Sequence, residues 1–240
     1  MPVQTPDKSD YTLIINSDFS DFADKLSSLG YKTHLLNSNI CLDKPVCKHA
    51  DMQFIALKSK TFVLPESNSV TEFLSLHNID FELTERAGKF YPRDVLCNGK
   101  EIGDKFFCNT KTIDKKILDF ALKSGLQIIH VNQGYTGCST LKVSDNSIIT
   151  SDKSIYEAAV KNKVEALLIS EGFIKLEGYN HGFIGGCSGN INNELIIFCG
   201  SLENHPDKNR IRNFIKERKL SILEFSFELT DIGGIGVIHI

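Results

Sequence analysis

The sequence lacks several features that would assign it to a common class of protein. None of its seven cysteines forms a Cys-x-x-Cys pair, which argues for reduced thiols and against a disulfide framework or a structural zinc site. The lysines and arginines form no basic stripe and the formal net charge is -3, so no nucleic-acid partner is expected. No apolar run approaches the length that a bilayer requires, and residues 1–10 lack an apolar signal core. These absences predict a cytoplasmic protein with no membrane partner, and they leave the oligomeric state open.

Phosphate-binding loops are also absent. Neither GxGxxG nor GxxxxGK[ST] follows a predicted strand, so no cofactor is predicted. Cys41 and Cys47 are the closest cysteine pair and make only a weak metal signal, so no metal site is predicted either. The chain of 240 residues is 41% hydrophobic and can bury a substantial core. We expect an N-terminal tail at residues 1–10 and a single domain at residues 11–240.

One structural unit is predicted to occur five times. Apolar spacing behind a polar capping residue indicates helices at residues 17–30, 67–77, 112–125, 151–162 and 205–219. A short β-rich run follows each helix, at residues 31–36, 79–84, 126–131, 165–170 and 220–225. In the first four units a turn segment comes next, followed by two short strands separated by a polar turn.

The residue that ends the turn segment recurs at a nearly constant spacing. The series is Asp51, Asp94, Cys138, Cys187 and Asp231. Its steps of 43, 44, 49 and 44 residues are typical of a radial or stacked array.

The two ends of the chain each supply an incomplete part of this unit. The fifth unit has one strand after its turn segment, and residues 10–17 form a strand with no partner in their own unit. Pairing these strands would close a ring and hide its edges. We therefore predict an α/β fold, a five-bladed α/β propeller with its helices outside. The commoner doubly wound parallel sheet is disfavoured because the turns within each unit are too short for parallel crossovers.

The ring would gather residues that could carry chemistry. His49 and Asp51 are two residues apart at the start of a predicted strand, so both side chains should point to the same face. Convergence of the aligned positions would bring them together with Asp94, Cys138 and Asp231 in one central cleft. Carboxylates, an imidazole and a thiol make a site for a compact cation that is attacked by a nucleophile.

Three short motifs resemble those of the pentein, or guanidino-group-modifying-enzyme, superfamily, which includes arginine deiminases, dimethylarginine hydrolases and amidinotransferases. HADMQF at residues 49–54 resembles the HxDxxF motif, and YPRDV at 91–95 resembles an aromatic-x-Arg-Asp segment. ELTDIGG at 228–234 is similar to an acidic residue beside paired glycines. The similarity covers residues 11–240, and the strongest likeness is to an uncharacterised bacterial family of this fold.

The resemblance implies roles for individual residues. Cys138, two blades after His49, would be the nucleophile, and Asp231, two blades further on, would orient the imidazole. Because Asp231 comes last in the chain, the ring would be circularly permuted relative to characterised members. Asp51 or Asp94 would hold a guanidinium through paired, charge-assisted hydrogen bonds.

Three further residues are candidates for substrate contacts. Arg93 belongs to the Arg-Asp motif, and Gln133 could orient a substrate or satisfy the backbone. Cys187 is either a small residue at a tight turn or an alternative nucleophile.

Two functions follow from these observations, and the sequence leaves open whether the protein is an enzyme. The first is a cysteine-dependent hydrolase or transferase whose substrate is a small cationic guanidine or amidine. The alternative is a non-catalytic ring that binds a macromolecule, since the same fold resembles a ribosome-subunit anti-association factor.

Overall fold

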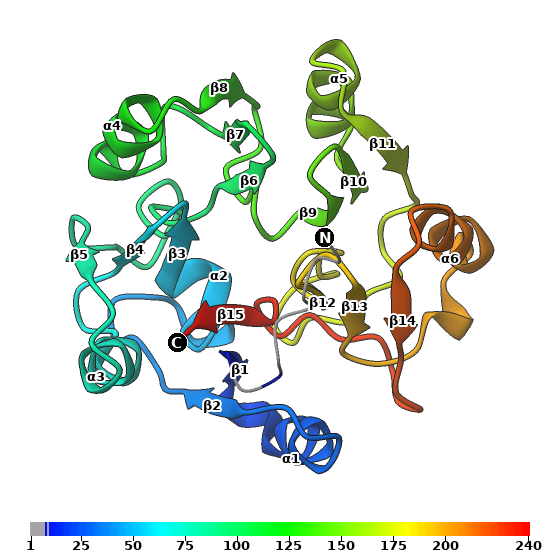
Figure 1. Cartoon of the computed structure of the whole chain (residues 1–240), viewed down its shortest axis with the longest axis horizontal. Helices are drawn as coiled ribbons and strands as arrows, with labels where there is room; N and C mark the ends of the chain where they lie inside the picture. The colour runs from blue at the N-terminus through cyan, green and yellow to red at the C-terminus, as the bar shows by residue number, and fades with distance from the viewer. Residues whose placement is uncertain (1–7, 9) are drawn as a thin grey trace, which may run out of the picture.

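The computed structural model describes residue 8 and residues 10–240, and it forms a ring of five three-stranded sheets (Figure 1). In each sheet the middle strand pairs antiparallel with an inner strand and parallel with an outer strand. The inner strands surround the ring axis, and the longer helices lie on the outside (Figure 1). The predicted five-bladed α/β propeller is therefore confirmed.

Every blade uses its three strands in the same way. The inner strands are β3 (Phe54–Leu57), β6 (Lys100–Ile102), β9 (Thr140–Ser144), β12 (Ser188–Ile191) and β15 (Gly236–His239). The middle strands are β4 (Lys60–Val63), β7 (Lys105–Cys108), β10 (Ser147–Thr150), β13 (Leu195–Phe198) and β1 (Tyr11–Asn16). The outer strands are β5 (Phe81–Leu83), β8 (Gln127–His130), β11 (Glu165–Leu168), β14 (Ser221–Leu223) and β2 (Thr33–Leu36).

One amphipathic helix connects the middle strand of each blade to the outer strand. These helices are α1 (Ser20–Ser28), α3 (Asn68–Leu76), α4 (Lys115–Lys123), α5 (Lys153–Lys161) and α6 (Lys208–Glu217). Short 3-10 helices occur at η1 (Ser17–Phe19), η2 (Lys44–Val46) and η3 (Leu202–Asn204). All five long helices and all five outer strands lie within the ranges predicted from sequence. No helix in the described part of the chain combines the length and apolar character needed to cross a membrane.

The two ends of the chain meet in one blade. β1 is flanked by β15 on one side and by β2 on the other, with Tyr11 opposite His239 and Ile14 opposite Gly236. All six residues of β1 are buried. The pairing predicted from the unpartnered terminal strands therefore closes the ring.

The structure corrects the prediction at residues 50–53. Ala50–Gln53 form a short helix, α2, with His49 at its N-cap, and the strand begins only at Phe54. The backbone amide of Asp51 donates to the carbonyl of Gly233 (2.9 Å), so this turn packs against the neighbouring blade. His49 has an extended backbone and Asp51 lies within the helical turn, so the alternation of side chains along a strand does not apply to this pair. The two side chains line different pockets, and the expectation that they share one face is wrong.

Deleting residues 1–16 should destabilise the whole domain rather than shorten a tail, because it removes β1 from between two strands. We expect Tm to fall by more than about 10 °C, since each kcal/mol is worth roughly 2–4 °C in a chain of this size. Differential scanning calorimetry would measure the change, with a deletion of residues 1–7, which leaves β1 intact, as the control. An unchanged Tm in the longer deletion would contradict ring closure by β1.

Candidate functional site

A pocket of about 260 Å³ gathers residues from distant parts of the chain. It is built mainly by the segments that precede the inner strands. We call it the cysteine pocket, and its lining residues are Val46, His49, Met52, Tyr135, Cys138, Leu176, Tyr179, Asn180, His181, Phe183 and Asp231. The three residues that sequence reasoning proposed as catalytic, Cys138, His49 and Asp231, are all among them.

Asp231 is held rigidly beside His49. Its Oδ1 lies 3.9 Å from Nδ1 of His49, and both side chains are almost completely buried. The carboxylate also accepts two backbone hydrogen bonds, from the amide of Phe183 to Oδ2 (2.8 Å) and from the amide of Gly233 to Oδ1 (2.9 Å). With both oxygens fixed by amides, the carboxylate keeps a constant position relative to the imidazole.

Two glycines make this close approach possible. Gly233 has a φ of +83°, and a Cβ at this position would lie 2.2 Å from Cβ of His49. A Cβ at Gly186 would lie 2.2 Å from Oδ1 of Asp231. The paired glycines in the DIGG and GFIGG segments thus leave room for His49 and Asp231 to meet.

Asn98 organises the backbone and the thiol of Cys138. Its Oδ1 accepts hydrogen bonds from the amides of Gly137 (2.7 Å) and Cys138 (3.2 Å), and its Nδ2 donates to Sγ of Cys138 (3.0 Å). Nδ2 also lies 3.0 Å from the carbonyl oxygen of Asp51. This one buried amide therefore links the inner turns of three blades.

The environment of Cys138 favours the protonated form of its thiol. Burial raises the pKa of Cys138 well above its usual value, and the negative charges of Asp51 and Asp231 raise it further. The hydrogen bond from Asn98 opposes this shift. Since the thiolate is the reactive form, the thiol gains reactivity only when positive charge is brought close to it.

Asp231 is also perturbed. Burial raises the pKa of its carboxyl group to about 6, and the charge of Asp51 adds to the shift. Interaction with His49 and the two backbone hydrogen bonds lower it.

The repeat register explains which residues reach the pocket. His49, Tyr135, Phe183 and Asp231 each stand five residues before the first residue of an inner strand, and all four line the cysteine pocket. The five positions aligned from the sequence differ in their distance from the first residue of the inner strand. That is why the aligned residues do not all converge on one cleft as expected.

Asp94 and Cys187 lie outside the cysteine pocket. Asp94 is behind Tyr135, whose hydroxyl donates to Oδ2 of Asp94 (2.6 Å). Cys187 is fully buried, and its thiol donates to the carbonyl of Ile184 (3.3 Å). Cys138 is the third residue of the turn before β9, whereas Cys187 is the fourth residue of the equivalent turn before β12. This shift of one position sends the Cys187 side chain into the core.

Arg93 and Gln133 also lie away from the pocket. Arg93 is exposed, and its Nη1 pairs with Oε2 of Glu85 (2.9 Å). Gln133 lines a surface groove, where its Nε2 donates to Oδ2 of Asp152 (3.0 Å).

A long loop before β12 supplies pocket residues that sequence reasoning missed. Leu176, Tyr179, Asn180 and His181 come from this loop. The step of 49 residues between Cys138 and Cys187, longer than the other steps, was the available signal. Residue 8 and residues 10–240 contain no group of three or more His, Cys, Asp and Glu side chains that could hold a metal ion.

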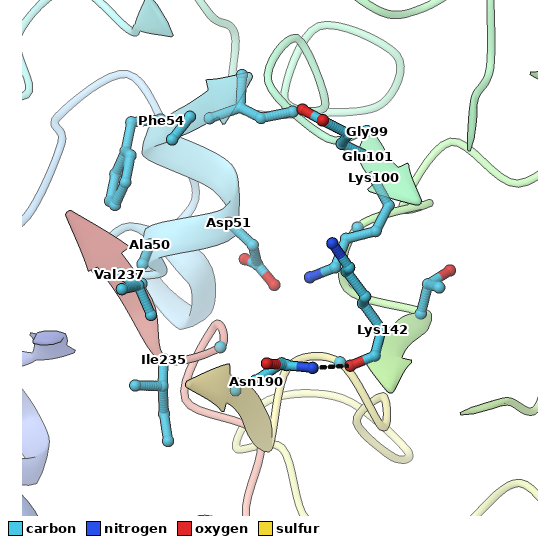
Figure 2. A pocket seen from close by; sticks show the side chains of 18 of the residues that line it. Ala50, Asp51, Phe54, Gly99, Lys100, Glu101, Lys142, Asn190, Ile235 and Val237 are labelled. Carbon is cyan, nitrogen blue, oxygen red and sulfur yellow. Dashed lines mark hydrogen bonds between the residues drawn. The ribbon is translucent and has the colours of Figure 1, made fainter. Parts of the chain in front are cut away.

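Asp51 lines a second pocket, of about 390 Å³, which runs along the inner strands. We call it the lysine pocket, and its polar side chains include those of Asp51, Lys100, Thr140, Lys142 and Asn190. Figure 2 shows the side chains of Lys100 and Lys142 directed toward that of Asp51. Among the described residues, no hydrogen bond of ordinary geometry reaches the two buried carboxylate oxygens of Asp51, although the Cys138 thiol lies near enough for its side-chain contact with Asp51 to raise the thiol pKa. Burial lowers the pKa of the Lys100 amine, and the charge of Asp51 opposes that shift.

One protein family matches nearly the whole chain. Its description is "Family of unknown function (DUF6873)", and the match covers residues 14–236. The chain belongs to this family. Among curated proteins, none matches the sequence.

Solved structures of several guanidino-modifying enzymes resemble this DUF6873 protein in fold. DDAH from Pseudomonas aeruginosa in complex with citrulline gives a TM-score of 0.59 at 10% identity, over 96% of this chain and 99% of that chain. The amidinotransferase SxtG from Microseira wollei gives 0.61 at 9% identity, over 92% and 78%. An inosamine-phosphate amidinotransferase from Streptomyces griseus gives 0.58 at 10% identity, over 90% and 76%. The DUF6873 protein thus has the pentein fold.

The Asp231 carboxyl should make the folded protein less stable as the pH rises. Its pKa of about 6 in the folded state exceeds the value of about 4 for an unfolded chain, so folding favours the protonated form. This contribution is complete below pH 4 and is lost as the pH rises through about 6. The free energy of unfolding of the wild type, minus that of Asp231→Asn, should therefore fall by about 2 kcal/mol between pH 4 and pH 7. Urea denaturation at each pH measures it, and parallel pH profiles for the two proteins would contradict the assignment.

Removing both opposed charges of the lysine pocket should stabilise the protein. The variant Asp51→Asn/Lys100→Met takes away two buried charged groups that form no ion pair within 4.0 Å among the described residues, and we expect a gain of about 1–3 kcal/mol in urea denaturation. The matched control is Asp104→Asn/Lys105→Met, which removes a surface pair of 2.6 Å and should change stability by less than about 0.5 kcal/mol. A loss of stability in the first variant would show that the two charges stabilise the fold.

Proposed function

We propose that this protein is a cysteine-dependent hydrolase or transferase that acts on a small guanidine or amidine. The observation that carries the proposal is that Cys138, His49 and Asp231, from three different blades, line one pocket of about 260 Å³. Further support comes from the solved structures of the same fold, which include DDAH and two amidinotransferases. Because that likeness concerns the fold, the proposal rests on the residues of the pocket.

The reaction assigns one role to each of the three residues. The thiolate of Cys138 attacks the central carbon of the bound cation and forms a C–S bond, and His49 protonates the amine that leaves as a C–N bond breaks. His49 then accepts a proton from water, or from an acceptor amine in a transferase, and the new nucleophile displaces the thiolate. Asp231 orients the imidazole and balances its positive charge when it is protonated.

The substrate itself would activate the thiol. Burial and the charges of Asp51 and Asp231 raise the pKa of Cys138. A guanidinium or amidinium bound beside Sγ would favour the thiolate by direct charge attraction. Reactivity would then be confined to complexes with a cation.

The lining of the cysteine pocket limits the rest of the substrate. No lysine or arginine is among its described lining residues, so an α-carboxylate would find no cationic partner inside it. The walls are largely apolar and aromatic, and the rings of Tyr135 and Phe183 are stacked with centroids 6.2 Å apart. Such faces suit a planar cation and an apolar substituent. We therefore propose an alkyl- or aryl-substituted guanidine or amidine rather than free arginine.

Chloroacetamidine and chloroacetamide form a matched cationic and neutral pair of alkylating agents that tests this proposal. Both would form a C–S bond with Cys138 as chloride leaves. We expect chloroacetamidine to label Cys138 at least about tenfold faster than chloroacetamide does, because each unit by which a bound cation lowers the thiol pKa multiplies the thiolate fraction by ten. Peptide mass spectrometry would follow the labelling in a Cys41→Ser/Cys47→Ser background, since Cys41 and Cys47 are the partly exposed cysteines.

The dependence on His49 is the control for chemistry. His49→Ala should slow the reaction of chloroacetamidine with Cys138, whereas Cys187→Ser, which changes a residue outside the pocket, should not. Equal rates with both reagents that are unchanged in His49→Ala would contradict the proposal, and the non-catalytic binding ring would then be the better reading.

A further inference from the structure

The lysine pocket contains polar and charged groups that lack a hydrogen bond or an ion pair with the described residues. Within the described part of the chain, both carboxylate oxygens of Asp51 and Oγ1 of Thr140 are buried without a hydrogen bond of ordinary geometry, and the contact of Asp51 with the neutral Cys138 thiol leaves the carboxylate charge unbalanced. Lys100 takes part in none of the ion pairs within 4.0 Å that the described residues form. Groups of this kind cost stability unless something binds to them.

The other two lysines of the pocket do have partners. Nζ of Lys58 lies 2.9 Å from Oε1 of Glu101, and Nζ of Lys142 lies 2.6 Å from Oδ1 of Asp145. The charged groups of this pocket that form no ion pair with the described residues are therefore the Asp51 carboxylate and the Lys100 amine. They come from neighbouring blades and face the same space, as Figure 2 shows.

Opposite charges in one pocket restrict what can bind there. A simple anion would lie close to the unpartnered carboxylate, and a simple cation would lie close to the Lys100 and Lys142 amines. Both contacts are repulsive and poorly screened away from bulk water. A molecule that carries an ammonium group and a carboxylate a few bonds apart can satisfy both sides at once.

We propose that the lysine pocket binds a small zwitterion of the α-amino acid class, with its ammonium group on Asp51 and its carboxylate on Lys100. The volume of about 390 Å³ leaves ample room, since a water molecule takes about 30 Å³ in the liquid. Lys100 has no ion pair to break when its side chain adjusts to the ligand.

Binding in this pocket would change the reactivity of Cys138. Asp51 is one of the two carboxylates that raise the pKa of the Cys138 thiol. An ammonium group placed on Asp51 would offset that charge and increase the thiolate fraction. This gives a second measurement that does not depend on the cysteine pocket being an active site.

The experiment compares glycine, the smallest zwitterion of this class, with acetate and methylammonium, which each carry one of its charged groups. Isothermal titration calorimetry and thermal shift at millimolar concentrations should show binding and a Tm increase of about 5 °C near saturation for glycine. Acetate and methylammonium should give little change. Equal shifts with acetate alone or with methylammonium alone would overturn the zwitterion assignment.

Variants locate the site. Lys100→Met and Asp51→Asn should each lose the glycine response, whereas Lys58→Met, which changes a lysine of the same pocket that already pairs with Glu101, should keep it. A glycine response that persists in Lys100→Met would overturn the proposal. Circular dichroism of each variant establishes that it is folded.

Alkylation of Cys138 by chloroacetamide provides the second readout. Glycine should increase its rate severalfold in the Cys41→Ser/Cys47→Ser background, and Asp51→Asn should abolish the increase. An unchanged rate with bound glycine would contradict the placement of the ammonium group on Asp51. Labelling by chloroacetamidine without glycine tests the cysteine pocket alone, so failure of either proposal can be told from failure of the other.

Discussion

The antiparallel pairing of β1 with β15 is the interaction on which the rest of the structure depends. It joins the last strand of the chain to a strand at its beginning and so completes the fifth blade. The segment just before β15 carries Asp231 and Gly233, and closure places it against the turn that holds His49, where the amide of Asp51 donates to Gly233. Without this pairing the His49–Asp231 contact would lose one of its main supports, because the two residues lie far apart in the sequence.

A second constraint is the short helix α2, whose residues line both pockets. His49 at its N-cap lines the cysteine pocket, and Asp51 within its turn lines the lysine pocket. The carboxylate of Asp231 accepts hydrogen bonds from two backbone amides, whereas that of Asp51 accepts none from the described residues. Buried polar groups without a hydrogen bond are concentrated at binding sites, where a protein is less stable than its fold allows.

The fold could be predicted because its helices and strands follow from local sequence patterns. The site could be predicted only in part, because its geometry depends on contacts between blades. The helices and outer strands follow from apolar periodicity and from polar N-caps such as Asp114 and Asp152, which lie close in sequence to the elements they start. The positions of His49, Cys138 and Asp231 in one pocket followed from counting blades. The helical turn of α2 and the inward side chain of Cys187 did not follow, since a shift of one residue in a turn is decided by packing against the next blade. Asn98 has no sequence signal, because its contacts lie in two other blades.

The two carboxylates near Cys138 influence it in different ways. Asp231 is fixed by amides and faces His49, so its charge is balanced by groups whose positions the fold determines. Asp51 accepts no amide hydrogen bond from the described residues, and its carboxylate faces the side chains of Lys100 and Lys142 in the lysine pocket (Figure 2). Electrostatic effects act over several ångströms away from bulk solvent, so a ligand in the lysine pocket, as proposed, would alter the thiol through Asp51. Of the two charges that keep Cys138 protonated, Asp51 is therefore the one that a solute can change.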